Sequence, residues 1–176
     1  MIWVAQGVGI LAITTFLLSY QQKKRKNIIL LNVTSRALYI LQYLLLGAFE
    51  GALLDVVGIL ASLLAQNKDR PIIKKHIRLF FILTSGIIIF SGLLLYEDIF
   101  SLFPIAGVLL HTGAFWLTNE KHIRRVSFIG SPFWMVYNLS QMAYSSSLGD
   151  FLSMVSIGTA MWRYDRKRKP KKEEKL

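Results

Sequence analysis

Hydrophobic residues in this chain fall into long continuous runs and not into the stripes of an amphipathic helix. Seven such segments can be marked, at about residues 2–20, 28–47, 51–66, 79–95, 101–118, 126–145 and 149–163. A bilayer needs about 20 apolar residues for each spanning helix. The pattern predicts an all-α, polytopic membrane protein with seven transmembrane helices, and the short third and seventh segments leave a six-span alternative open.

Basic residues lie between the segments, in every second connection. Residues 21–27, 67–78 and 118–125, together with the tail 163–176, hold every Lys and Arg except Arg36. The other connections carry acidic residues and no basic one: Glu50, Glu97, Asp98 and Asp150. Because Lys and Arg of short loops stay in the cytoplasm, we expect seven spans with the N-terminus outside and the C-terminus cytoplasmic. A six-span chain would place several basic residues on the wrong side.

Composition agrees with a membrane setting and excludes several functions. Hydrophobic residues make up 53% of the 176, and the net charge is +11. The basic loops account for that charge and lack the interleaved aromatic residues of a nucleic-acid surface, so the expected partner is the lipid bilayer and not nucleic acid. The chain has no cysteine. A disulfide, a thiolate metal site and a cysteine nucleophile are therefore excluded.

The two halves of the chain resemble each other. A shift of 98 residues without a gap pairs Gly9 with Gly107, Lys23 with Lys121, Tyr39 with Tyr137 and Gly51 with Gly149. We expect a first three-helix repeat at 1–70, a linker helix at 71–98, a second three-helix repeat at 99–164 and a basic, disordered cytoplasmic tail at 165–176. The linker helix is needed because three helices end on the opposite side of the membrane from where they began.

Four short motifs carry a resemblance to a known family. The opening "AQGVG", the basic loop after the first segment, "LLG" closing the second and "LFPIAG" opening the fifth resemble the bacterial inner-membrane proteins typified by YgjV. The resemblance implies a location in the inner membrane and brings no activity with it. The 3+1+3 layout is also similar to that of SWEET and PnuC-type transporters. The proline-glutamine pair of PQ-loop proteins is absent here, where "SYQQ" stands instead.

Arg36 is the one basic residue inside a predicted span. It lies eight residues from the inner end of its segment, roughly 12 Å deep at about 1.5 Å per residue. A charge at that depth is costly unless it faces protein or water. Helical spacing and the 98-residue shift bring two polar and aromatic faces together around it. The predicted solute-binding residues are Arg36, Tyr39, Tyr43, Asp55, Trp134, Tyr137, Asn138, Gln141 and Ser153.

Each of these residues also has a structural interpretation. Arg36 could form an ion pair with Asp55 or extend its side chain towards the membrane surface. The aromatic residues could simply pack, and the amides could hydrogen-bond neighbouring helices. For His111, which has no second imidazole or carboxylate at ligand spacing, we expect a hydrogen bond in the core and no metal.

The function expected from these patterns is movement of a small polar solute. No nucleophile has a base and an orienting partner near it, so we expect neither an enzyme nor a cofactor. Arg36 and the tyrosines favour an anionic or hydroxyl-bearing solute. The alternatives are a ligand-sensing receptor without transport and a structural membrane subunit, and the residues favour no oligomeric state. Water access distinguishes the three, because a transporter exposes its site to both sides, a receptor to one and a structural subunit to neither.

Overall fold

The computed structural model describes residues 2–141 and 143–165, and helices dominate them. The helices are α1 (Ile2–Tyr20), α2 (Arg25–Leu46), α3 (Phe49–Gln66), α4 (Pro71–Lys75), α5 (Ile77–Leu94), α6 (Leu102–Phe115), α7 (Glu120–Ser140) and α8 (Tyr144–Ala160). A 3₁₀ turn at Ile99–Ser101 precedes α6, and a π-helical turn at Met161–Asp165 extends α8. These described residues include no strand. The all-α class is confirmed, while the predicted tail lies outside the described residues except for Asp165.

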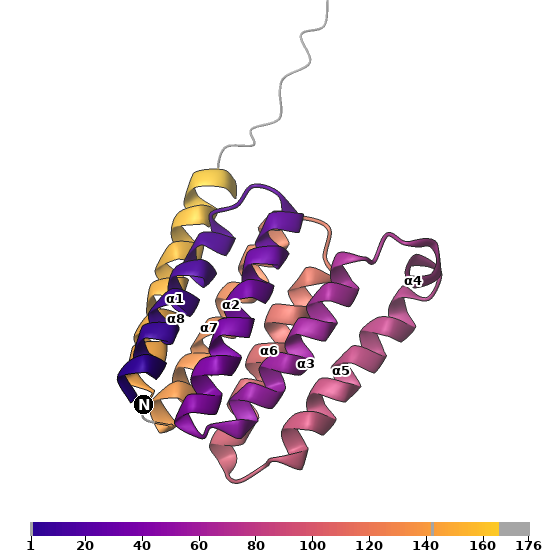
Figure 1. Cartoon of the computed structure of the whole chain (residues 1–176). Coiled ribbons are helices and arrows are strands. Elements are labelled where there is room, and N and C mark those ends of the chain that lie inside the picture. The colour runs from indigo at the N-terminus through magenta and orange to yellow at the C-terminus, as the bar shows by residue number, and fades with distance from the viewer. Residues whose placement is uncertain (1, 142, 166–176) are drawn as a thin grey trace, which may run out of the picture.

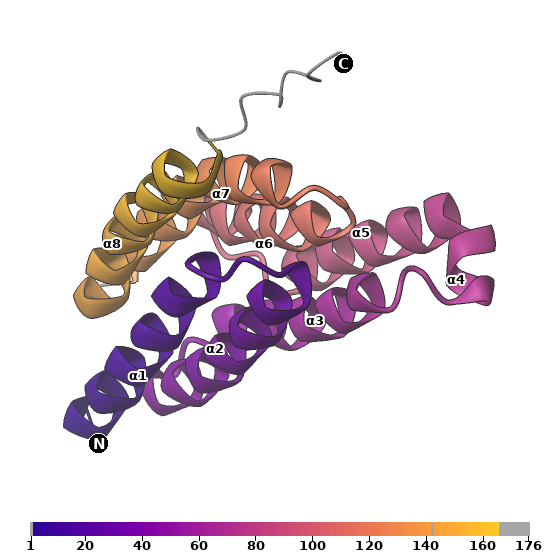
Figure 2. The ribbon, with the colours of Figure 1, turned by 90° about the horizontal axis from the view of Figure 1, so that it is seen from above.

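The long helices form two layers (Figure 2). One layer holds α1, α2 and α3 in that order, and the other holds α8, α7 and α6. Close contacts join α1 to α8 and α3 to α6, so each helix of one layer faces a helix of the other. Helix α5 continues the second layer and packs on α3 and α6. The core therefore lies between α2 and α7, the middle helices of the two layers.

The surface of the bundle is apolar where a membrane would surround it. By length and composition, four described helices could cross a membrane: α1 from Trp3, α2, α3 and α5. Ile99–Phe115 is a shorter apolar helix. In α5 only Ile88, Ser91 and Gly92 are buried. Apart from the half-buried Phe80, its remaining leucines, isoleucines and phenylalanines are exposed, as expected of a lipid-facing helix.

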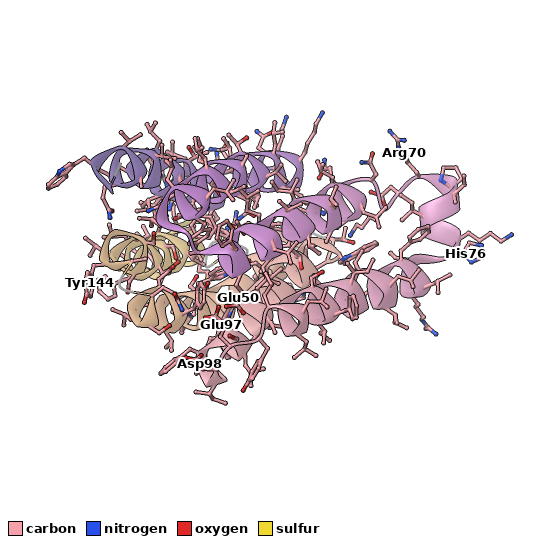
Figure 3. The ribbon with its side chains drawn as sticks, turned by 60° about the horizontal axis from the view of Figure 1, so that its bottom comes forward. Glu50, Arg70, His76, Glu97, Asp98 and Tyr144 are labelled. Carbon is pink, nitrogen blue, oxygen red and sulfur yellow. The ribbon has the colours of Figure 1, made fainter. Side chains whose placement is uncertain are left out.

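The basic connections gather at one end of the bundle. The turns after α1, α3 and α6 lie at the end opposite the N-terminus, where α8 also ends (Figure 1). The turns after α2 and α5 lie at the other end. Glu50, Glu97 and Asp98 lie close together at that second end, well away from Arg70 and His76 (Figure 3). Charge is therefore separated along the bundle axis, as the loop pattern predicts.

The two layers share one pattern of helix ends and buried positions, with an offset of 95 residues. Helix α1 ends at Tyr20 and α6 at Phe115, while α2 begins at Arg25 and α7 at Glu120. Every buried position of α2 has a buried counterpart in α7 at this offset. The predicted offset of 98 is therefore wrong by three residues, which is close to one helical turn and so leaves the helix faces nearly in phase.

Candidate functional site

A small polar cavity lies between the two layers. Its volume is about 30 Å³, which is room for about one water molecule. Six of the nine predicted site residues line it. The full lining is Phe16, Ser35, Arg36, Tyr39, Tyr43, Asp55, His111, Trp134, Asn138 and Asp150. We call this cavity the central chamber.

Arg36 forms an ion pair with Asp55 inside the central chamber. Its Nη1 donates to Asp55 Oδ1 at 2.5 Å, and its Nε donates to Asn32 Oδ1 at 3.1 Å. Both charged side chains are buried. A Cβ on Gly58 would lie 2.6 Å from Arg36 Nη1, so the absence of a side chain there makes room for the guanidinium. The ion pair with Asp55, one of the interpretations left open for Arg36, is therefore confirmed.

Three aromatic rings form one wall of the chamber. The rings of Tyr39 and Tyr43 stack with centroids 6.1 Å apart, and Tyr43 stacks on Trp134 at 6.4 Å. The indole ring lies against Gly107, where a Cβ would come within 2.7 Å of it. The two layers therefore meet through aromatic faces, with Tyr39 and Tyr43 from α2 and Trp134 from α7.

Asp150 is a chamber residue that the sequence analysis missed. It was expected in an outer connection, and that placement is wrong, because it lies within α8 and is only 7% exposed. Asn138 donates to Asp150 Oδ2 at 2.8 Å and accepts from the Tyr43 hydroxyl at 3.2 Å. The offset of 95 residues pairs Asp150 with Asp55. That pairing is the signal that could have found it.

Three predicted site residues lie outside the chamber lining. Tyr137 and Gln141 line a separate hollow of about 190 Å³ at the acidic end, together with Glu50 and Glu97. Ser153 lies beside the chamber, where its hydroxyl contacts Ser131 Oγ at 3.2 Å and donates to the backbone carbonyl of Asp150 at 2.6 Å. It therefore supports α8 rather than lining the cavity.

His111 has the core role that was expected of it. Its Nδ1 lies 2.9 Å from the hydroxyl of Tyr20, a hydrogen bond that joins α6 to α1. The described residues contain no group of three His, Asp or Glu side chains that could hold a metal ion. The chamber can thus offer charge, hydrogen bonds and aromatic faces to a solute.

At the basic end, three cationic side chains cross from one layer to the other. Arg25 donates to the backbone carbonyls of Ala65 and Phe115 at 2.6 and 2.5 Å, and its Nε donates to the Leu117 carbonyl at 3.2 Å. These carbonyls lie at or just beyond the C-termini of α3 and α6, where cations are favoured by the helix dipole. Arg25 therefore ties the end of its own layer to the end of the other.

Lys68 and Arg124 also join the two layers at the basic end. Lys68 Nζ donates to the Trp116 carbonyl at 2.7 Å, and burial lowers the pKa of its ammonium group below the usual value. Arg124 Nη2 donates to the Gln22 carbonyl at 3.1 Å, and its Nη1 pairs with Asp165 at 2.9 Å. The loop cations thus have structural contacts besides their part in membrane topology.

These features define the chain as a helical membrane protein with a polar chamber between two layers. It belongs to the bacterial inner membrane protein family Imp-YgjV, whose model matches residues 3–168. Inner membrane protein YgjV of Escherichia coli (strain K12) is 24% identical over 172 residues, which cover 94% of this chain and 88% of that protein. No solved structure matches the chain. The expected family and inner-membrane location are confirmed.

Proposed function

We propose that this protein moves a small polar solute across the inner membrane through the central chamber. The observation that carries the proposal is the chamber itself, where a buried ion pair, a second buried carboxylate and three aromatic rings converge from both layers. Ionisable side chains inside a membrane are costly, and they mark solute or ion pathways by default. A core with only a packing role would be expected to hold apolar side chains there.

The proposed topology has seven spans. In it α1, α2, α3, α5, α6, α7 and α8 all cross the membrane, with the acidic end outside and the basic end in the cytoplasm. The shared pattern of α1–α3 and α6–α8 supports a pair of three-helix units joined by α5, the parallel-repeat layout also found in SWEET transporters. Helix α7 has 21 residues, which at about 1.5 Å per residue is long enough for a bilayer core of about 30 Å.

The proposed mechanism is rocking of the two units about the chamber. In the described conformation the two layers are joined at the basic end by hydrogen bonds. Side chains of Arg25, Lys68 and Arg124 donate them to backbone carbonyls of the opposite layer. The acidic end holds a larger hollow. Breaking the cation contacts would open the chamber to the cytoplasm, and parting the layers at the acidic end would open it to the outside.

Solute access is tested with single cysteines, for which the chain is already a cysteine-free background. Ser35 lines the chamber, and we expect Ser35→Cys to react with a membrane-impermeant thiol reagent applied from either side of the membrane. The measurement is labelling of intact cells and of inside-out vesicles. The control is Ser62→Cys, because Ser62 is equally buried but does not line the chamber. The control should stay unlabelled from both sides.

The pattern of labelling separates the candidate functions. Reaction of Ser35→Cys from both sides supports transport. Reaction from one side only would instead indicate a receptor, and reaction from neither side would indicate a structural subunit. Equal labelling of Ser62→Cys would mean that the bundle had lost its packing.

The proposed orientation makes a separate prediction at two exposed acidic residues. Glu97 lies at the acidic end and Asp69 follows α3 at the basic end. In intact cells the impermeant reagent should label Glu97→Cys and leave Asp69→Cys untouched, and lysis should make both reactive. The reverse pattern would contradict an external acidic end, because the positive-inside rule would then fail for this chain.

A further inference from the structure

We propose that the solute carries a positively charged ammonium group and that Asp150 binds that group in the central chamber. This inference rests on the proposed function, and it gives the solute a chemical class. It also replaces the expectation of an anionic or hydroxyl-bearing solute, which Arg36 and the tyrosines suggested.

The charges that line the chamber leave one carboxylate in excess. Arg36 is the only Lys or Arg in the lining, and its guanidinium is engaged by Asp55 at 2.5 Å. Asp150 has a neutral partner, the amide of Asn138. Among the residues that the structure describes, Asp150 takes part in no salt bridge. An anionic solute would therefore meet an occupied arginine and an uncompensated carboxylate.

A buried carboxylate without a counter-charge must be neutralised by a proton or by another cation. Asp150 accepts a hydrogen bond from the Asn138 amide, which carries no charge, and the residue as a whole is 7% exposed. An ammonium group can supply both the positive charge and hydrogen-bond donors. Its arrival would displace any proton held there, so binding should release protons.

The aromatic wall suits the same chemistry. Tyr43 connects to Asp150 through Asn138 and stacks on Trp134. Cations bind over tyrosine and tryptophan faces, most strongly where water is excluded, and aromatic rings beside a carboxylate are a common way to hold quaternary ammonium groups. The chamber thus pairs a negative charge with electron-rich faces.

The acidic end of the bundle would attract the same class of solute. Glu50 and Glu97 line its hollow, and Asp98 lies close by (Figure 3). Clefts with one sign of charge raise the local concentration of oppositely charged solutes. A cation would therefore meet negative charge in the hollow at the acidic end and again in the central chamber.

The test compares charged and neutral probes on the purified full chain in detergent. The cations are methylammonium and choline, the neutral isostere of choline is 3,3-dimethylbutan-1-ol, and sodium chloride controls for salt. Because the described chamber has room for about one water molecule, binding of choline requires the two layers to part around it. At about one hundred times Kd we expect a cation to raise Tm by about 5 °C or more. In lightly buffered solution the same addition should release protons, while the neutral isostere should do neither.

Asp150→Asn should abolish both effects, because it keeps the shape of the side chain and removes its charge. Asp69→Asn at the basic end is the matched control and should retain them, because its carboxylate is exposed and lines neither the chamber nor the hollow at the acidic end. If Asp150→Asn does not fold, the comparison of choline with its isostere on the parent protein still decides the outcome. The inference is overturned if neither cation shifts Tm, if the isostere acts as strongly, or if folded Asp150→Asn responds like the parent.

Failure of this inference and failure of transport give different results. Cation binding with one-sided labelling of Ser35→Cys would keep the ammonium site and reject transport. Two-sided labelling without a cation effect would keep transport and reject the solute class.

Discussion

Replacing Asp55 by leucine is expected to destabilise the protein by about 3–5 kcal/mol, because the change leaves the charge of Arg36 buried without a partner. The two groups are 2.5 Å apart in the middle of the bundle. Arg36 keeps only Asn32 as a side-chain partner in that variant. The free energy of unfolding can be measured by titration with a denaturing detergent and followed by circular dichroism.

The double variant Arg36→Met/Asp55→Leu should recover most of that loss. Replacing a whole buried ion pair with apolar groups of similar volume is often neutral or stabilising. Glu97→Gln controls for the removal of an exposed carboxylate and should stay within about 0.5 kcal/mol of the parent. A double variant as unstable as Asp55→Leu would contradict the pairing, since the leucine itself would then be the cause.

The same variants separate stability from function. If the pair only holds α2 to α3, a stable double variant should bind choline as the parent does. If the pair also shapes the chamber for solute, the double variant should be stable and should lose binding. Stability and binding therefore have to be measured on the same preparation.

The all-α class could be predicted, and the ion pair could be named as an alternative, because burying unpaired polar groups or charges in a membrane costs free energy. Long apolar runs with basic residues in alternate connections allow few arrangements in a bilayer. Arg36 in the middle of such a run needs a partner, and Asp55 is the acid in the neighbouring segment. Burial of charge without compensation costs so much that sequence alone points to the pair.

Asp150 could not be placed from the sequence because helix boundaries are poorly marked there. The segment that starts at Tyr144 opens with small and polar residues, and an acid near a segment end is easily assigned to a connection. The error of three residues in the repeat offset hid the same residue. At 98 residues Asp55 falls on Ser153, whereas at 95 it falls on Asp150.

The correct offset also shows that the two layers contribute different charges to the chamber. Asp55 and Asp150 hold equivalent places in the two layers, but their surroundings differ. Arg36, the partner of Asp55, has Ser131 as its counterpart in the second layer. The two acids are therefore alike in position, and Asp55 alone is compensated. That difference is the origin of the negative charge available to a solute.

Arg25→Met at the basic end should be the second most damaging change, with an expected loss of about 2–4 kcal/mol. The guanidinium donates to three backbone carbonyls in the two layers, and one hydrogen bond from a charged group contributes about 1.5–3 kcal/mol net. The expected loss stays below the sum of three because Arg25 is only partly buried and water can reach the freed carbonyls. Lys26→Met, at the next position and exposed, is the matched control. The detergent titration that measures Asp55→Leu also measures this pair.

Stability alone cannot show whether Arg25 also closes the chamber, and a kinetic measurement can. In the Ser35→Cys background, Arg25→Met should speed labelling from the cytoplasmic side and leave labelling from the outside unchanged or slower, because the contacts that tie the layers at the basic end are lost. Lys26→Met should change neither rate. A loss of stability with equal labelling rates would mean that Arg25 joins the helix ends without controlling access, and the closing contact would then have to be sought at Lys68 or Arg124.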